Sequence, residues 1–124
     1  MDLMKEAINA KNNSYCPYSK FRVGAALLTK ENKIYTGCNI ENSSYSPSCC
    51  AERVAIFKAV SEGVNDFKAI AINGDTDFCY PCGVCRQVIS EFCDKDFKIY
   101  IGNQEQTKEY TLEDLLPHSF DLEK

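Results

Sequence analysis

The spacing of hydrophobic and polar residues along the chain predicts helices and strands in a regular order. Leu3, Met4, Ala7 and Ile8 recur at helical spacing, which indicates a helix over residues 2–11. Two apolar runs follow, separated by a short polar stretch as in a β-hairpin, and they cover residues 21–29 and 34–40. The chain is therefore expected to begin with one helix and a two-stranded hairpin.

Helical and strand patterns alternate in the rest of the chain. A helical pattern runs from Ala51 until Gly63, and a second one follows Pro81. The remaining expected elements are a strand over 68–72, a turn over 73–75, a strand over 97–101, a weaker strand over 108–110 and a short helix capped by Thr111 and Asp114. Strands separated by helices imply crossover connections and parallel pairing in this second half. The expected fold class is α/β, with a mixed sheet of about five strands and helices on its faces.

Length and charge narrow the range of functions. The chain has 124 residues, which fits one domain over 1–124, and 44% of them are hydrophobic, as in ordinary globular proteins. It has 14 Lys and Arg residues against 18 Asp and Glu residues, a formal charge of -4. Binding to a phosphate backbone needs clustered basic residues, so a nucleic-acid partner is not expected. A small, neutral or weakly charged ligand fits this composition better.

Whether the cysteines indicate disulfides or a metal site depends on the redox conditions of the protein's compartment. Residues 1–11 show no apolar run with a cleavage site, and no stretch approaches the roughly 20 apolar residues of a membrane-spanning helix. The protein is therefore expected to be cytoplasmic, without a membrane partner, where thiols stay reduced. The eight cysteines then indicate a metal or catalytic site before they indicate disulfides.

Two short segments combine cysteines with predicted helix starts. Cys50 directly precedes one predicted helix, and Cys82 and Cys85 lie three residues apart at the start of the next. That spacing presents both sulfurs on one side of the first helical turn. Helix N-termini favour negative charge and therefore thiolates, which are the form that binds metal. Cys50, Cys82 and Cys85 are the predicted ligands of one zinc ion.

The number of ligands distinguishes a catalytic zinc from a structural one. A structural zinc has four protein ligands, whereas a catalytic zinc keeps one position for water. Cys49 or Cys79 could supply a fourth sulfur. The number of cysteines therefore also allows a structural zinc site with four protein ligands. The single histidine, His118, is distant in sequence from both segments. Adjacent residues at a helix start point in different directions, which disfavours shared ligation by Cys49 and Cys50.

Glu52 and Arg53 lie two and three residues after Cys50, the first predicted ligand. A carboxylate two residues after Cys50 can approach a zinc-bound water without ligating the metal, and can act as general acid and base. A single glutamate on a helix is more often simply exposed, but the neighbouring cysteines favour the catalytic role for Glu52. Three thiolates on Zn²⁺ leave a net charge of -1, which a guanidinium at Arg53 would offset. Arg86, beside Cys85, is a weaker candidate for the same task.

The chain resembles the small homotetrameric cytidine deaminases of the zinc-dependent nucleoside deaminase superfamily. The similarity lies in the blocks 17–27, 37–42, 50–53 and 81–87, and in residues 115–117 with Phe120. It extends over about residues 2–120. Cys16, Cys49 and the pair Cys79–Tyr80 depart from the family pattern, and their roles beside the site are open.

The resemblance implies a fold, a reaction and a set of site residues. It implies a three-layer α/β/α sandwich, one Zn²⁺ per subunit and subunits that complete one another's sites in a homotetramer. It assigns the ribose hydroxyls to Asn39 and Glu41, a stacking position to Phe21, a backbone contact with the base to Ala51, and contacts from a neighbouring subunit to Ser43, Tyr45 and Phe120. The implied reaction is hydrolytic deamination of cytidine and deoxycytidine to uridine, deoxyuridine and ammonia, as in pyrimidine salvage.

Three alternatives accompany this interpretation. A blasticidin-type deaminase has the same fold and zinc, but does not need Asn39 and Glu41 in this arrangement. Deaminases that act on nucleic acids typically use one histidine ligand and a basic channel, whereas the first predicted ligand here is Cys50 and the chain is acidic. A non-enzymatic zinc-stabilised module would need a fourth ligand and would have no need for Glu52.

Overall fold

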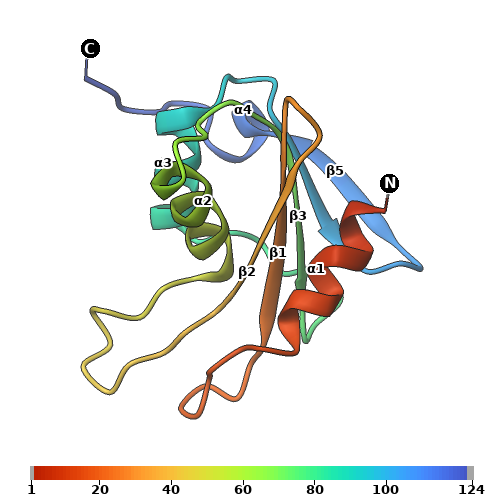
Figure 1. Ribbon diagram of the computed structural model, residues 1–124, viewed down its shortest axis with the longest axis vertical. Coiled ribbons are helices and arrows are strands. Elements are labelled where there is room, and N and C mark those ends of the chain that lie inside the picture. Colours follow the sequence, from red (N-terminus) through yellow and green to blue (C-terminus); the bar gives the residue numbers. More distant parts are fainter. Residues whose placement is uncertain (1, 123–124) are drawn as a thin grey trace.

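A five-stranded β-sheet forms the centre of the protein in the computed structural model, which describes residues 2–122 (Figure 1). Its elements are α1 (Leu3–Lys11), β1 (Val23–Thr29), β2 (Ile34–Cys38), α2 (Ala51–Ser61), β3 (Phe67–Gly74), α3 (Gly83–Phe92), β4 (Lys98–Gly102), β5 (Thr107–Thr111) and α4 (Leu112–Leu115). Helix α1 lies on one face of the sheet and α2 and α3 lie on the other. The predicted α/β class with three layers is therefore confirmed.

The order of the strands in the sheet is β2-β1-β3-β4-β5. Strands β3 and β4 pair in parallel across the crossover through α3, as the alternation of helix and strand predicts. The other neighbours, including β4 and β5, pair antiparallel. Parallel pairing in the second half is thus limited to one pair, because a short turn joins β4 to β5 and a tight connection reverses the direction of the chain.

The sheet separates two hydrophobic clusters of different size. Alternate residues of each strand point to opposite faces, so Ile70 and Ile72 of β3 face α2 and α3 while Ala71 between them faces α1. The larger cluster is built from bulky aliphatic residues, which include Leu27, Ile56, Ile70, Ile72, Ile89, Ile99 and Ile101. The smaller cluster beneath α1 consists of Met4, Ala7, Ala26 and Ala71.

Helix α2 packs directly against the backbone of β2 at Gly37. A Cβ atom at this position would overlap the carbonyl oxygen of Ala51 and lie 2.6 Å from the nitrogen of Ala55. Only glycine permits such a close approach of helix and strand. Gly37 therefore fixes the first turn of α2, which follows Cys50, against the sheet.

The expected turn over residues 73–75 is wrong in its first two positions. Strand β3 continues to Gly74, and Asn73 and Gly74 pair with Gly24 and Val23 of β1. The Asn73 side chain is buried and donates a hydrogen bond from Nδ2 to the carbonyl oxygen of Gly102 over 2.8 Å. This bond gives the buried amide nitrogen of Asn73 a partner inside the sheet. The Asn-Gly pair by itself predicts a turn and gives no sign of this partner.

The ends of other predicted elements move by one or two residues. Strand β1 begins at Val23 rather than at residue 21, and β2 ends at Cys38 rather than at residue 40. Ile40 instead forms isolated bridges with Tyr15 and Cys49. The cap predicted for the short C-terminal helix is present, since Thr111 and Asp114 exchange hydrogen bonds as a capping box at α4. No helix within residues 2–122 has the length and apolar character that crossing a membrane requires.

Candidate active site

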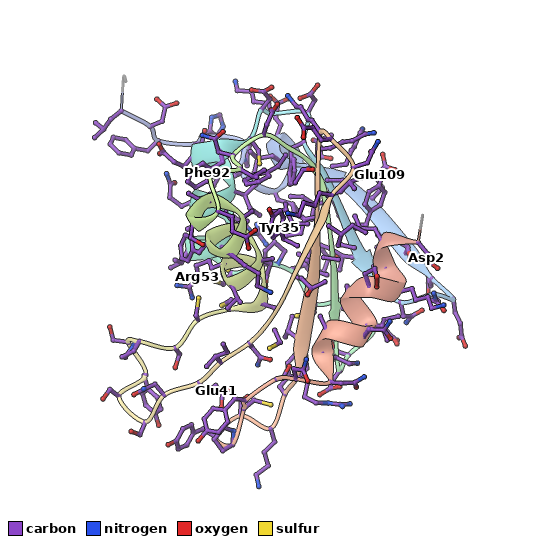
Figure 2. All side chains as sticks on the ribbon, viewed as in Figure 1. Asp2, Tyr35, Glu41, Arg53, Phe92 and Glu109 are labelled. Carbon is purple, nitrogen blue, oxygen red and sulfur yellow. The ribbon has the colours of Figure 1, made fainter. Side chains whose placement is uncertain are left out.

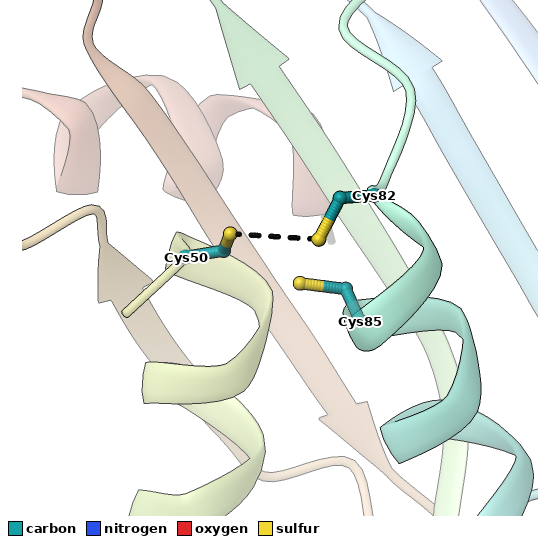
Figure 3. A group of neighbouring side chains, drawn as sticks. All are labelled: Cys50, Cys82 and Cys85. Carbon is teal, nitrogen blue, oxygen red and sulfur yellow. Dashed lines mark hydrogen bonds between the residues drawn. The ribbon is translucent and has the colours of Figure 1, made fainter. Parts of the chain in front are cut away.

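Three cysteine sulfurs meet where α2 and α3 begin. Cys50 and Cys82 are the N-cap residues of these helices, and Cys85 lies in the first turn of α3 (Figure 3). Their Sγ atoms all lie within 4.8 Å of one another, and those of Cys50 and Cys82 are 3.7 Å apart. A tetrahedral zinc with Zn–S bonds of about 2.3 Å places its sulfur ligands about 3.8 Å apart. The spacing and the chemistry of this group therefore fit a zinc site.

The hydrogen bond between Cys50 and Cys85 shifts the pKa values of these two thiols in opposite directions. Hydrogen bonding from Cys85, and then from Arg53 and Cys82, lowers the pKa of the Cys50 thiol to about 5 despite its partial burial. The same hydrogen bond to Cys50 raises the pKa of Cys85. Cys50 is therefore a thiolate at neutral pH before any metal binds, while Cys85 must lose a proton when it becomes a ligand.

Cys49 and Cys79 stand outside the three-sulfur group. Among the described residues, the group of metal-ligating side chains at this place consists of Cys50, Cys82 and Cys85. The backbone of Cys49 is paired with Ile40 in a β-bridge. Burial raises the pKa of Cys49, and it raises the pKa of Cys79 to about 11, so both thiols are neutral. This arrangement favours a three-ligand site with one position left for water.

Glu52 is buried beside these sulfurs, in contrast to the usual exposed glutamate of a helix surface. It lies in the first turn of α2 and its residue is only 3% exposed. Burial raises the pKa of Glu52 to about 7, and the negative charge of Cys50 acts in the same direction. A carboxyl group with this pKa can both accept and donate a proton at neutral pH, which is the requirement for general acid–base catalysis.

The two candidate arginines have different partners. Arg53 donates a hydrogen bond from Nη2 to the Sγ atom of Cys50 over 3.3 Å. Its Nε is buried and has no hydrogen-bond partner among the described residues, so a second donor is available at this end of α2. Arg86 instead donates to the carbonyl oxygens of Pro81 and Leu115, each over 2.8 Å. Arg86 therefore holds backbone segments together and Arg53 contacts the sulfur.

Asn39 and Glu41 hold the segment that leads into β1. The Asn39 side chain accepts from the backbone nitrogen of Val23 over 2.9 Å and donates to the carbonyl oxygen of Phe21 over 2.8 Å. Glu41 Oε1 accepts from the backbone nitrogens of Tyr18 and Ser19 over 3.0 and 3.1 Å. Hydrogen bonding from Ser19 lowers the pKa of Glu41, so its carboxylate is charged at neutral pH.

Glu41 lies away from Arg53 of α2 (Figure 2). A surface cavity of about 430 Å³ opens beside Glu41. Its lining consists of Tyr18, Ser19, Glu41, Asn42, Tyr45 and Ser48. Of the predicted substrate residues, this cavity contains Glu41 and Tyr45. Sequence reasoning assigned no role to Tyr18, Ser19 or Ser48, although the first two belong to the block 17–27 that carries the resemblance. A larger hollow, of about 590 Å³, lies beside α1 and includes none of the predicted site residues.

The remaining predicted substrate residues are distributed between the sheet and the surface. Ala51 is buried at the start of α2, and the Phe21 ring lies close to Gly74. Ser43 is exposed, and Tyr45 is 75% exposed with a left-handed backbone (φ 64°). Phe120 is 69% exposed, and its carbonyl oxygen accepts a hydrogen bond from Gln87 over 3.0 Å. Among residues 2–122, the cavity beside Glu41 includes Tyr45 but not Ser43, Phe120 or the three cysteines.

Comparisons with known proteins agree with the geometry of the site. The family model of the cytidine and deoxycytidylate deaminase zinc-binding region matches residues 1–101. A cytidine deaminase of Sporosarcina psychrophila is 52% identical over 123 residues, which are 98% of this chain and 90% of that protein. A blasticidin-S deaminase of Bacillus cereus is 33% identical over 108 residues, covering 80% of this chain and 76% of that protein.

The structural comparison points the same way. A crystal structure of cytidine deaminase from Burkholderia pseudomallei superposes with a TM-score of 0.91 at 42% sequence identity, covering 95% of this chain and 96% of that one. Sequence and fold thus match the same kind of protein over nearly the full length. The chain belongs to the cytidine and deoxycytidylate deaminase family.

Proposed function

We propose that this protein hydrolyses cytidine and deoxycytidine to uridine and deoxyuridine, with release of ammonia. The observation that carries the proposal is the buried Glu52, whose pKa is raised to about 7 by burial, beside three sulfurs spaced for zinc. Burying a carboxyl group costs free energy, so its burial beside the sulfurs points to a role beyond stabilising the start of the helix. A proton-transfer reaction at neutral pH is what such a group can perform.

The metal site would hold one Zn²⁺ on Cys50, Cys82 and Cys85. When bound there, the ion supplies Lewis acidity that lowers the pKa of the attacking water towards about 7. Glu52 would take a proton from the attacking water and deliver it to the ring nitrogen beside the amine-bearing carbon. It then transfers the second proton to the leaving amine, so one water is consumed and one ammonia is released. Arg53 offsets the negative charge of the thiolates through its contact with Cys50.

Substrate binding is assigned to four residues: Phe21, Asn39, Glu41 and Ala51. The charged carboxylate of Glu41 accepts two backbone hydrogen bonds at Oε1, and Oε2 can accept from a ribose hydroxyl. The Asn39 amide holds the backbone of Phe21 and Val23, and from this position it can approach the same sugar. Phe21 would stack on the base, and the backbone of Ala51 would contact its polar edge.

A homotetramer would complete the site. Tyr45 and Phe120 are large side chains that are 75% and 69% exposed in the single chain, and covering such groups is a common function of subunit contacts. In the proposed assembly, Ser43, Tyr45 and Phe120 reach the site of a neighbouring subunit. Sedimentation equilibrium is expected to show a tetramer, and a fully active monomer would contradict this part of the proposal.

We further propose one domain over 1–124, a cytoplasmic location and a role in pyrimidine salvage.

Absorbance assays test the reaction directly. Zinc-loaded protein is mixed with cytidine, deoxycytidine and blasticidin S, and ultraviolet absorbance is followed with and without a chelator. The proposal predicts conversion of both cytidine nucleosides that stops when zinc is removed. Conversion of blasticidin S alone would assign the protein to the other deaminase activity. Zinc binding without any conversion would instead support the non-enzymatic module.

A further inference from the structure

The loop that carries Cys82 is attached to the edge of the sheet. Residues 75–82 join β3 to α3, and Cys82 is the last of them. Cys82 is the exposed member of the three-sulfur group, whereas Cys85 is buried within α3. No side chain caps α3 at Cys82. The backbone of Cys82 is held from α3, where the backbone nitrogen of Arg86 donates to its carbonyl oxygen over 3.0 Å, and from the loop that precedes it.

Two aromatic residues of the loop contact strand β5. The Tyr80 hydroxyl is hydrogen-bonded to the Tyr110 hydroxyl over 2.7 Å, and the two rings meet edge to face with centroids 5.6 Å apart. The Lys108 ammonium lies 4.1 Å from the centroid of the Phe78 ring. Lys108 and Tyr110 are two residues apart on β5 and so project from the same face.

Tyr80 is separated from Cys82 by Pro81 alone, so its restraint passes through a stiff connection. Proline fixes its own φ angle and restricts the backbone of the residue before it. Arg86 restrains the same point from α3, since its Nε donates to the carbonyl oxygen of Pro81 over 2.8 Å. The backbone before Cys82 is thus held from β5 on one side and from α3 on the other.

We propose that Tyr110 is a positioning residue for the metal site: through Tyr80 it holds Cys82 where zinc can be shared with Cys50 and Cys85. It touches neither metal nor substrate. The inference rests on the zinc site of the proposed function. It assigns a purpose to Tyr80, one of the residues by which this chain departs from its family pattern.

Zinc release from the loaded full-length protein tests this role. Release to a chromogenic chelator is measured for wild type, Tyr110→Phe and Tyr110→Ala, together with the thermal unfolding of each metal-free form. Loss of a residue that orients a metal ligand is expected to weaken zinc binding about tenfold. Tyr110→Ala should show this loss, and Tyr110→Phe, which keeps the ring contact, a smaller one. At saturating zinc, both should recover most of the wild-type kcat.

A second tyrosine hydroxyl provides the matched control. Tyr35 donates to Glu62 over 3.2 Å at the C-terminal end of α2, so Tyr35→Phe removes a hydroxyl hydrogen bond without changing the loop over 75–82. It should leave zinc release unchanged. Tyr80→Phe should match Tyr110→Phe, and the double variant should be no worse than either, because one hydrogen bond joins the two hydroxyls. This pair remains informative if Tyr110→Ala fails to fold.

The outcomes separate this inference from the proposed function. Unchanged zinc release in Tyr110→Ala and in the double variant would overturn the positioning role and leave the zinc site intact. A lower unfolding temperature of the metal-free variants with unchanged zinc affinity would show a structural role only, and would also overturn it. A wild-type chain that binds no zinc would instead contradict the proposed metal site itself.

Discussion

The guanidinium of Arg53 donates to the sulfur of Cys50 over 3.3 Å, within the first turn of α2. The two residues are three positions apart, so the helix itself brings donor and acceptor to the same face. This contact is one of the hydrogen bonds that lower the pKa of Cys50, after that from Cys85. The charge of the site is thus partly balanced by its own helix.

Removing this donor should weaken metal binding and raise the pKa of Cys50. Arg53→Ala is expected to lower zinc affinity about tenfold, as for other groups that support a metal ligand. In the metal-free protein, alkylation of Cys50 followed against pH should show its midpoint move upward from about 5. Arg22→Ala, which removes a guanidinium bonded to Asp75 instead, is the control and should change neither quantity. An unchanged alkylation midpoint in Arg53→Ala would contradict the role given to the guanidinium.

The identity of the ligands can be tested by replacing cysteines one at a time. Cys50→Ser is expected to lose stoichiometric zinc, because it removes a member of the three-sulfur group. Cys49→Ser and Cys79→Ser should retain one zinc per chain, since both thiols lie outside this group. Metal content after dialysis is the measurement. Zinc loss in Cys49→Ser with retention in Cys50→Ser would reverse the assignment.

Asp75 should stabilise the fold in a pH-dependent manner. Its carboxylate accepts hydrogen bonds from the backbone and side chain of Arg22 and lies 3.4 Å from Lys11 Nζ, which ties α1 and the start of β1 to the end of β3. Hydrogen bonds from Arg22 lower the pKa of Asp75 from 3.8 to about 2. Because the folded pKa is depressed, the stabilisation is complete above about pH 4 and disappears as the pH falls through about 2.

Asp75→Asn is therefore expected to reduce the free energy of unfolding by about 1 kcal/mol at pH 6, a modest value for a partly exposed carboxylate. The difference from wild type should shrink as the pH falls from 4 to 2, as urea denaturation at several pH values can show. Asp66→Asn serves as the control, because its pair with Lys30 is largely exposed and should contribute little. A difference that stays constant with pH would contradict the charge-based explanation.

The sequence predicts a structural feature well when the residues that form the feature are close together in the chain. The ligand cysteines could be predicted from the sequence because Cys82 and Cys85 share one helical turn and Cys50 directly precedes a helix. The strand position of Asn73 could not be predicted, because its amide nitrogen donates to Gly102, 29 residues away. The contact between Tyr80 and Tyr110 could not be predicted either, because these residues are 30 positions apart. Partners on different elements leave no periodic signal in a single sequence.

Arg86 and Asn39 illustrate the same limit within the site. The position of Arg86 beside Cys85 suggested a sulfur contact, but the fold brings the carbonyl oxygen of Leu115 within 2.8 Å of its Nη1. The resemblance assigned Asn39 to ribose, and the structure adds a contact with the backbone of Phe21. Residue type and spacing indicated where these side chains gather. Only the packed structure shows which atom each one contacts.

The central claim is that Glu52 transfers the protons of the reaction. Glutamine has almost the same shape but cannot take up or release a proton, so Glu52→Gln should keep the site intact and lose the chemistry. We expect turnover of cytidine to fall by about 10²- to 10⁴-fold, the usual contribution of a general acid–base group. Zinc content and the binding of uridine should stay close to wild type. Glu62→Gln, which replaces a glutamate outside the site at the end of α2, is the matched control and should keep full activity.

The most direct measurement is single-turnover conversion of cytidine by zinc-loaded Glu52→Gln, followed by ultraviolet absorbance alongside its metal content. The proposed role predicts one bound zinc per chain and a conversion rate lowered by at least about 10²-fold. A conversion rate like that of the wild type in the zinc-loaded variant would contradict it.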